Sequence, residues 1–309
     1  GEKEGGTLAL ALAQPISLTR LATAKILACG VVVLSLTAAL TLAAAVAASV
    51  ELGAPGAFSS LAAYFGITAV YGLFWFSLAL LVNAFGRGSA TNAVILAGVW
   101  LTLALIVPSA TSLFAATLYP VPSRVEMIQS VRVAGQEASE RGSQLLSAYF
   151  EDHPEMAPEG EIDPRDYYSL KFVTEDEISR QIAPLTERFE AQIRGQQSVV
   201  EKFRFLSPAI LAQQALNDLS GTGYSRFDHF RSEAGRFADE WKSHFLPQIF
   251  RKTVVTAEAL GELPRFSYRP ERPSAIAERV GGTALLIALS AVLLLGTASW
   301  ALRRYPLTA

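Results

Sequence analysis

The stretch ILACGVVVLSLTAALTLAAAVAASV, residues 26–50, decides the fold because it contains no charged side chain. A hydrocarbon core about 30 Å thick is crossed by roughly 20 apolar residues in a helix. Residues 26–50 exceed that length, so we predict a membrane-spanning helix here. A long helix buried in a soluble protein is the alternative for any single stretch of this kind.

Three further stretches share this character, at residues 58–85, 93–119 and 280–302, and none has a charge in its interior. Four such stretches in one chain are not expected of soluble proteins, whose helices normally carry a polar face. The sequence therefore predicts an all-α membrane protein with a transmembrane helix bundle of four spans.

The charged residues are distributed very unevenly along the 309 residues. Of the 54 Asp, Glu, Lys and Arg residues, seven precede position 120 and two follow position 279. The other 45 predict one large, water-facing helical domain at residues 120–279, inserted before the last span. The net charge of −2 gives no general attraction to nucleic acid. Cys29 is the only cysteine, which excludes a disulfide framework.

Basic residues outside the insert indicate the orientation of the spans. They flank the first span on its N-terminal side, occupy the turn between the second and third spans, and follow the fourth: Arg20, Lys25, Arg87, Arg303 and Arg304. The turn at residues 51–57 has no Lys or Arg. Cytoplasmic loops carry the excess of basic residues. We therefore expect the inner membrane of a bacterium, with residues 120–279 on the periplasmic, extracytoplasmic side.

The segment before the first span, GEKEGGTLALALAQPISLTRLATAK at residues 1–25, combines a short amphipathic helix with a basic end. Thr7 is an N-cap candidate, Pro15 ends the helix, and Ser17 is a second N-cap candidate. This pattern predicts a segment that lies on the cytoplasmic membrane surface. An ordinary interfacial helix is the alternative.

Nine residues of this segment resemble the coupling segment of ATP-binding-cassette (ABC) type-2 exporter permeases: Glu2, Glu4, Gly6, Thr7, Leu8, Gln14, Pro15, Ser17 and Lys25. Ala9 departs from that pattern, because relatives often carry a charged residue there. In the family this segment lies between the second and third membrane helices and docks on the ATPase subunit. The resemblance thus implies two helices before Glu2, and six spans in the full-length protein.

The resemblance extends along the chain through NAVILAGVW at 92–100, YPVPSR at 119–124, FLSPAILAQQALNDLSGTG at 205–223, and residues 226–245. These pieces are similar to one branch of the family, which carries a large extracytoplasmic domain of uncharacterised function before its last span. The implied order is a coupling segment at 1–25, three spans within 26–119, the insert at 120–279, the last span at 280–302 and a cytoplasmic tail at 303–309.

The resemblance implies a permease subunit that is not itself an enzyme. Its expected partners are a cytoplasmic ABC ATPase in two copies, a second permease that is identical or related, and the lipid bilayer. The chain has no G-x-x-x-x-G-K-[ST] loop for phosphate, so ATP is expected on the partner and no cofactor is expected here. The residues expected at the ATPase contact are Glu2, Glu4, Thr7, Leu8, Gln14, Pro15 and Ser17.

Four residues within the spans are candidates for lining a substrate path: Tyr71, Phe74, Trp75 and Pro108. Plain helix packing is the alternative for the three aromatic residues. Pro108 should kink its span and leave one backbone carbonyl without its usual donor. The nearby hydroxyls that could satisfy this carbonyl belong to Ser109, Thr111 and Ser112.

Within the insert, Ser207-Pro208 predicts an N-cap followed by proline at the first helical position, and Gly221 closes that helix. Thr174 to Glu177 predict a capping box that begins another helix. Aromatic residues then recur at helical spacing, which predicts a core stripe, with binding of a hydrophobic cargo as the alternative: Phe227, Phe230, Phe237, Trp241 and Phe245.

The three histidines, His153, His229 and His244, all lie in the insert. None has the i, i+4 partner of a helical zinc site, so we expect neither a metal nor a catalytic centre. Two other functions stay open at this point. One is a membrane-anchored envelope binding or sensor protein, and the other is a membrane enzyme that uses the histidines and acidic residues of the insert.

Overall fold

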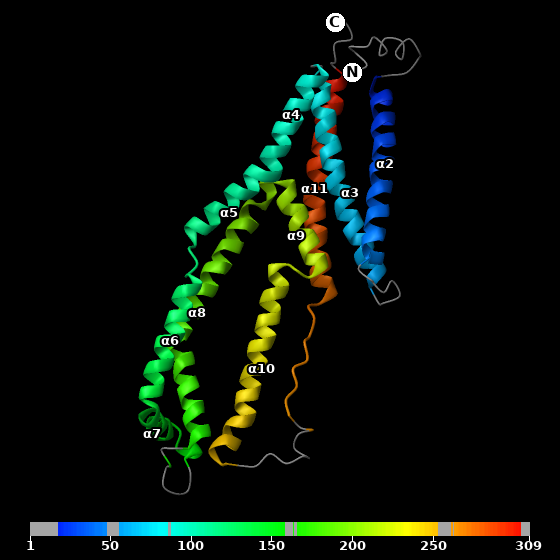
Figure 1. The fold of residues 1–309 in the computed structure, drawn as a ribbon. Coiled ribbons are helices and arrows are strands. Elements are labelled where there is room, and N and C mark those ends of the chain that lie inside the picture. The colour runs from blue at the N-terminus through cyan, green and yellow to red at the C-terminus, as the bar shows by residue number, and fades with distance from the viewer. Residues whose placement is uncertain are drawn as a thin grey trace. The chain divides into compact units, whose positions relative to one another are not determined.

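The structure is a computed structural model, and it describes residues 18–47, 56–85, 88–157, 163, 166–252, 261 and 263–303. Within these residues every regular element is a helix (Figure 1). The elements are α2 (Leu18–Ala47), α3 (Ala57–Ala84), α4 (Ser89–Leu101), η1 (Thr102–Ile106), α5 (Val107–Leu118), α6 (Arg124–Glu140), α7 (Gly142–Asp152), η2 (Pro154–Met156), α8 (Tyr167–Phe203), η3 (Arg204–Leu206), α9 (Pro208–Ser220), α10 (Tyr224–Phe250) and α11 (Pro273–Arg303).

Four helical segments are long and apolar enough to cross a membrane, at Leu27–Ala47, Ala57–Ala84, Ser89–Leu118 and Pro273–Leu302. The third is one continuous run of α4, η1 and α5, in which η1 is a π-helical turn. The chain is therefore a multi-pass, all-α membrane protein, and the fold class predicted from the hydrophobic stretches is confirmed.

The chain divides into two compact units. The first, here called the membrane unit, comprises residues 1–112, 201–226 and 271–309, and the second, the insert unit, comprises residues 113–200 and 227–270. This division differs from the single domain expected at residues 120–279. Residues 201–226 and 271–279 belong with the spans, because they pack against them.

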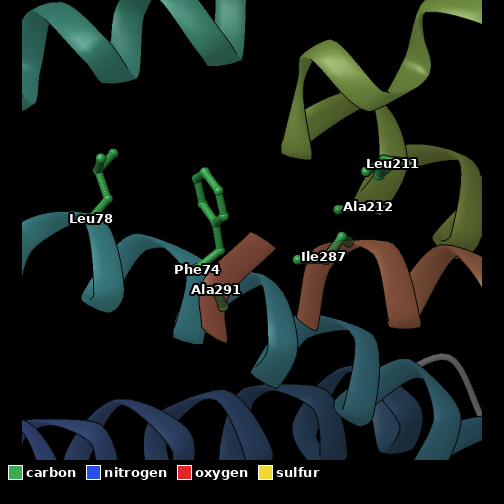
Figure 2. Packing of buried hydrophobic residues seen from close by; sticks show 6 residues of the cluster. All are labelled: Phe74, Leu78, Leu211, Ala212, Ile287 and Ala291. Carbon is green, nitrogen blue, oxygen red and sulfur yellow. The ribbon is translucent and has the colours of Figure 1, made fainter. Parts of the chain in front are cut away.

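Helix α9 lies within residues 120–279, which the sequence predicted to form one domain, but it belongs to the membrane unit. Leu211 and Ala212 of α9 pack with Phe74 of α3 and Ile287 of α11 in one buried cluster (Figure 2). A second cluster joins α9 to the same two helices through Ala215, and its buried members are Ile67, Ala215 and Val280. The reason lies in the sequence of α9, PAILAQQALNDLS, which has a single charged residue and several apolar ones to remove from water.

The insert unit contains the end of α5, all of α6, α7 and η2, and most of α8 and α10. Helices α6 and α7 follow one another closely, and Arg141 lies at the break between them. Tyr149 and Phe150 of α7 pack with Val173 of α8 and Phe250 of α10 in an aromatic core. This core holds the three helices together at one end of the unit.

The capping box expected at Thr174 is wrong. Helix α8 begins seven residues earlier, at Tyr167, and continues for 37 residues. Thr174 lies inside it, with its hydroxyl donating to the carbonyl of Leu170 at 2.7 Å. At the observed start, Asp166 accepts from the backbone N–H of Leu170 at 2.9 Å and from the Ser169 hydroxyl at 2.7 Å.

Gly195 of α8 makes a close contact that its sequence pattern did not reveal. Gln196 donates to the backbone carbonyl of Tyr119 at 2.8 Å, and the Tyr119 ring lies directly against Gly195. A Cβ at position 195 would overlap Cδ1 of that ring and lie 2.6 Å from Cε1 and Cγ. The link between the end of α5 and α8 therefore requires glycine.

We expect Gly195→Ala to destabilise the insert unit by about 1–2 kcal/mol, because overpacking outweighs the gain of about 1 kcal/mol in helix propensity. Thermal unfolding of the purified full chain, followed by far-UV circular dichroism, measures the change. The matched control is Gly235→Ala in α10, where a Cβ would meet no atom within 4 Å. That control should raise the stability, and a similar rise at position 195 would contradict the contact.

Candidate functional site

The N-terminus of α9 is fixed by Ser207, whose side chain is fully buried. Its hydroxyl oxygen accepts from the backbone N–H groups of Ala209 at 3.1 Å and Ile210 at 3.3 Å. The same hydroxyl donates to the carbonyl of Leu103 at 2.5 Å. One serine therefore caps α9 and joins it to the third span, 104 residues earlier in the chain.

The carbonyl of Leu103 is available because of the π turn and Pro108. In η1 the N–H of Val107 donates to the carbonyl of Thr102, five residues back. The next bond in this series would run from residue 108 to Leu103, but proline has no N–H. A carbonyl without a donor is costly in an apolar environment, and the Ser207 hydroxyl satisfies it.

The sequence predicted the open carbonyl but placed its donor among the neighbours of Pro108. In the structure Thr111 donates instead to the carbonyl of Val107, at 2.8 Å. The signal that could have indicated Ser207 is its role as a cap. A capping hydroxyl accepts with its oxygen and still has a hydrogen to donate, so a buried one needs an acceptor.

The C-terminus of α9 is held by polar contacts. Gly221 adopts the left-handed conformation with φ of 69°, and Thr222 N–H donates to the carbonyl of Asn217 at 2.9 Å. Asp218 lies 3.4 Å from Nε of Arg279 in α11. Arg279 also binds both carboxylate oxygens of Glu271, at 2.6 and 2.9 Å. Helix α9 is therefore attached at both ends, to the third span and to the fourth.

The expected path residues lie around this junction. Phe74 is buried between α3, α9 and α11, and Tyr71 and Trp75 are partly buried against the same cluster. The Trp75 ring meets Phe74 and Tyr71 edge-on, with centroids 5.4 and 6.0 Å away. These contacts give the three aromatic residues a packing role. Pro108 lies in α5, two residues beyond the π turn, as the expected kink requires.

The residues predicted at the ATPase contact lie outside the described residues. They are Glu2, Glu4, Thr7, Leu8, Gln14, Pro15 and Ser17. The structure describes the helix that continues from them, α2, from Leu18 onward.

The three histidines make separate local contacts in the insert unit. His153 lies 3.4 Å from Glu155, His229 is 2.8 Å from the carbonyl of Arg269, and His244 is 3.2 Å from Gln248. In the part of the chain that the structure describes, no three His, Cys, Asp or Glu side chains gather as a metal would need.

The aromatic stripe of α10 is not the buried core that its spacing predicted. Phe227, Phe230 and Trp241 remain 57%, 47% and 46% exposed. Phe230 and Phe237 contact Phe266, which lies in the non-helical segment before α11, with ring centroids 5.9 and 5.4 Å apart. Helical spacing placed these rings on one face of α10. The segment at residues 264–272, which forms no helix, contacts part of that face through Phe266.

Residues 124–269 match the family model described as a domain of unknown function (DUF3526). The match includes α9 as well as the helices of the insert unit, so it crosses the boundary between the two units. No curated protein and no solved structure matches the chain.

We expect Ser207→Ala to destabilise the membrane unit by about 2–4 kcal/mol. Loss of the cap contributes about 1 kcal/mol, and the unsatisfied Leu103 carbonyl contributes a further 1–3 kcal/mol. Unfolding of the full chain in mixed micelles with increasing sodium dodecyl sulfate, followed by circular dichroism, measures the loss. The control is Ser220→Ala, which removes an exposed hydroxyl from the other end of α9 and should change little.

A double-mutant cycle with Pro108→Ala separates the two contributions. Alanine at position 108 restores an N–H that can reach the Leu103 carbonyl, so Ser207→Ala should cost about 1–2 kcal/mol less in that background. An equal cost in both backgrounds would show that the Leu103 bond contributes nothing beyond the cap.

We expect Arg279→Gln to lower stability by about 1–3 kcal/mol, because the half-buried carboxylates of Asp218 and Glu271 lose their shared cation. Arg279→Lys should recover only part of this loss, since lysine cannot reproduce the two-pronged contact with Glu271. The same unfolding measurement applies, with Arg272→Gln as the exposed control. Full recovery by lysine would contradict the importance of that geometry.

Proposed function

We propose that this chain is the permease subunit of an ABC type-2 exporter, which moves an unidentified substrate across a bacterial inner membrane. The observation that carries the proposal is the coupling-segment pattern from Glu2 to Lys25, placed directly before a membrane span. The hydrophobic stretches at residues 26–50, 58–85, 93–119 and 280–302 have no charged side chain in their interiors, which also supports it, because ion-driven transporters commonly carry ionisable groups along their paths. Energy then comes from a separate ATPase.

In this proposal, ATP binding closes two partner ATPases against residues 1–25, and the segment passes the movement to α2. Helix α2 contacts α3 and α11, and both of these pack on α9. Because Ser207 and Asp218 attach α9 to the third and fourth spans, a shift of these spans moves α9 with them. The π turn at η1 supplies a position where the third span can change its bend.

The proposed complex has two permeases, identical or related, and two ATPase subunits. Residues 120–279 lie on the periplasmic side in this proposal, and the polypeptide itself binds no cofactor, since ATP is bound by the partner. The residues proposed for the ATPase contact are those of the coupling segment, and the junction around Phe74 and Pro108 is the proposed neighbourhood of the substrate path.

A second candidate is a membrane-anchored envelope protein that binds a partner or senses a ligand through the insert unit. The half-exposed aromatic side chains of α10 favour it, because exposed aromatic groups are enriched where proteins bind partners. This candidate needs the spans and the insert but no ATPase at residues 1–25.

Co-purification with an ATPase distinguishes the exporter permease from the membrane-anchored envelope protein. The full-length protein, co-expressed with its candidate ATPase and purified in mild detergent, should retain the ATPase. Glu2→Ala combined with Glu4→Ala should weaken the association or the rate of ATP hydrolysis by about tenfold or more, as loss of charged contacts at an interface does.

The matched control is Glu51→Ala, which removes a carboxylate from the turn expected on the opposite side of the membrane. It should leave both association and hydrolysis unchanged. If no ATPase is retained by the unaltered protein, the exporter proposal fails and the anchor or sensor takes its place.

A further inference from the structure

The insert unit contains a pocket of about 210 Å³ between α8 and α10. Its walls are apolar and come from both helices: Phe172, Trp241, Phe245, Leu246 and Ile249. The C-terminal end of α10 approaches the N-terminal part of α8 (Figure 1). The residues that line the pocket belong to these parts of the two helices. All of its lining belongs to the insert unit.

The floor of the pocket is preformed. Phe172 meets Phe250 edge-on with ring centroids 5.6 Å apart, and Tyr149 stacks on Phe250 at 5.0 Å. These rings belong to the aromatic core that joins α7, α8 and α10. Burial in this core is the main reason why the pKa of Tyr149 is raised. A ligand would therefore meet a fixed apolar surface rather than create one.

The volume limits what the pocket can hold. Sites for drug-sized ligands measure about 300–1,000 Å³, whereas a dry apolar cavity of about 150 Å³ holds benzene. A pocket of about 210 Å³ lies between these values. It therefore suits the apolar end of a longer molecule, whose remainder stays outside the pocket. Trp241 stands at the boundary, half exposed and tilted against Phe245 with ring centroids 4.0 Å apart.

The opening is lined by two carboxylates, Glu175 and Asp176, and by one cation, Lys242. Asp176 accepts two hydrogen bonds from Arg180, at 2.6 and 3.0 Å, and Glu175 lies 2.5 Å from Lys171. Each of these two carboxylates thus has a cation partner on α8, and Arg180 also lies 4.0 Å from Glu177. Lys242 of α10 has only a longer contact of 3.5 Å with Asp176, and its side chain is 53% exposed. It adds a positive charge that an arriving anion can pair with.

We propose that this pocket binds the chain of a single-chain amphiphile with an anionic head, a carboxylate or a phosphate. The apolar chain enters between Phe172, Phe245 and Ile249, and the head lies at the opening beside Lys242. The site is complete within the insert unit, so its occupancy requires neither an ATPase partner nor export.

Photochemical cross-linking tests the site directly. The full chain, in lipid nanodiscs, is exposed to a ten-carbon carboxylic acid that carries a diazirine in its chain, and labelled peptides are identified by mass spectrometry. Labels are expected on residues 172–179 of α8 and 241–249 of α10, and excess decanoate should remove them. Labelling confined to the spans would overturn the proposal.

A variant pair at Ser179 tests the pocket itself. Ser179 is exposed and lines the pocket, so Ser179→Phe fills the space without removing an apolar wall, while Ser179→Ala leaves it open. Ser179→Phe should reduce labelling of α8 and α10 more than tenfold, and Ser179→Ala should not. Circular dichroism confirms that both variants fold, and equal labelling of two folded variants would overturn the pocket as the site.

Head-group competition tests the charge. Decanoate or decyl phosphate should compete, and the stronger of the two indicates a fatty acid or a phosphate-bearing lipid as the source; decylamine should compete poorly. Lys242→Gln should weaken competition by the anions about two- to fivefold, the range for an exposed charge pair. The control Lys252→Gln removes a similarly exposed lysine, 3.6 Å from Asp166, that does not line the pocket. Equal competition by decylamine would overturn the anionic assignment.

Discussion

A single backbone carbonyl, that of Leu103, determines how the rest of the membrane unit is arranged. Proline at position 108 removes the N–H that would have bonded to it, and no water is available inside a bilayer to replace that donor. The hydroxyl of Ser207 takes this place while it caps α9. Because the hydroxyl must reach the third span, the start of α9 has to lie against that span.

Once its start is fixed there, α9 completes the packing of the unit. Its apolar face fills the space between α3 and α11, and Asp218 at its other end pairs with Arg279 of α11. The chain consequently alternates between units, leaving the membrane unit after residue 112, returning at 201–226 and returning again at 271. The uncharged stretch at residues 205–217 belongs to the membrane unit, although the sequence around it is rich in charged residues.

In the proposed exporter, movement of the coupling segment would reach α9 through the packing of α2 on α3 and α11 and of these two helices on α9. The contacts of Ser207 and Asp218 attach α9 to the third and fourth spans. This arrangement also leaves the insert unit with a function of its own to explain. An apolar pocket lies between α8 and α10, next to the aromatic core that these helices share with α7. Lys242 lies at its opening, 3.5 Å from Asp176. Packing and charge therefore point to an amphiphilic ligand independently of how the spans work.

The sequence by itself determined the four spans, because uninterrupted apolar runs of membrane length have one stable environment. It also determined the ends of α9, since Ser207-Pro208 and Gly221 act through neighbouring backbone groups. Only the tertiary structure decided which helices α9 joins, where the Leu103 carbonyl finds its donor, and that Phe227, Phe230 and Trp241 stay partly exposed. Those outcomes depend on residues far apart in the chain, whose contacts no local pattern encodes.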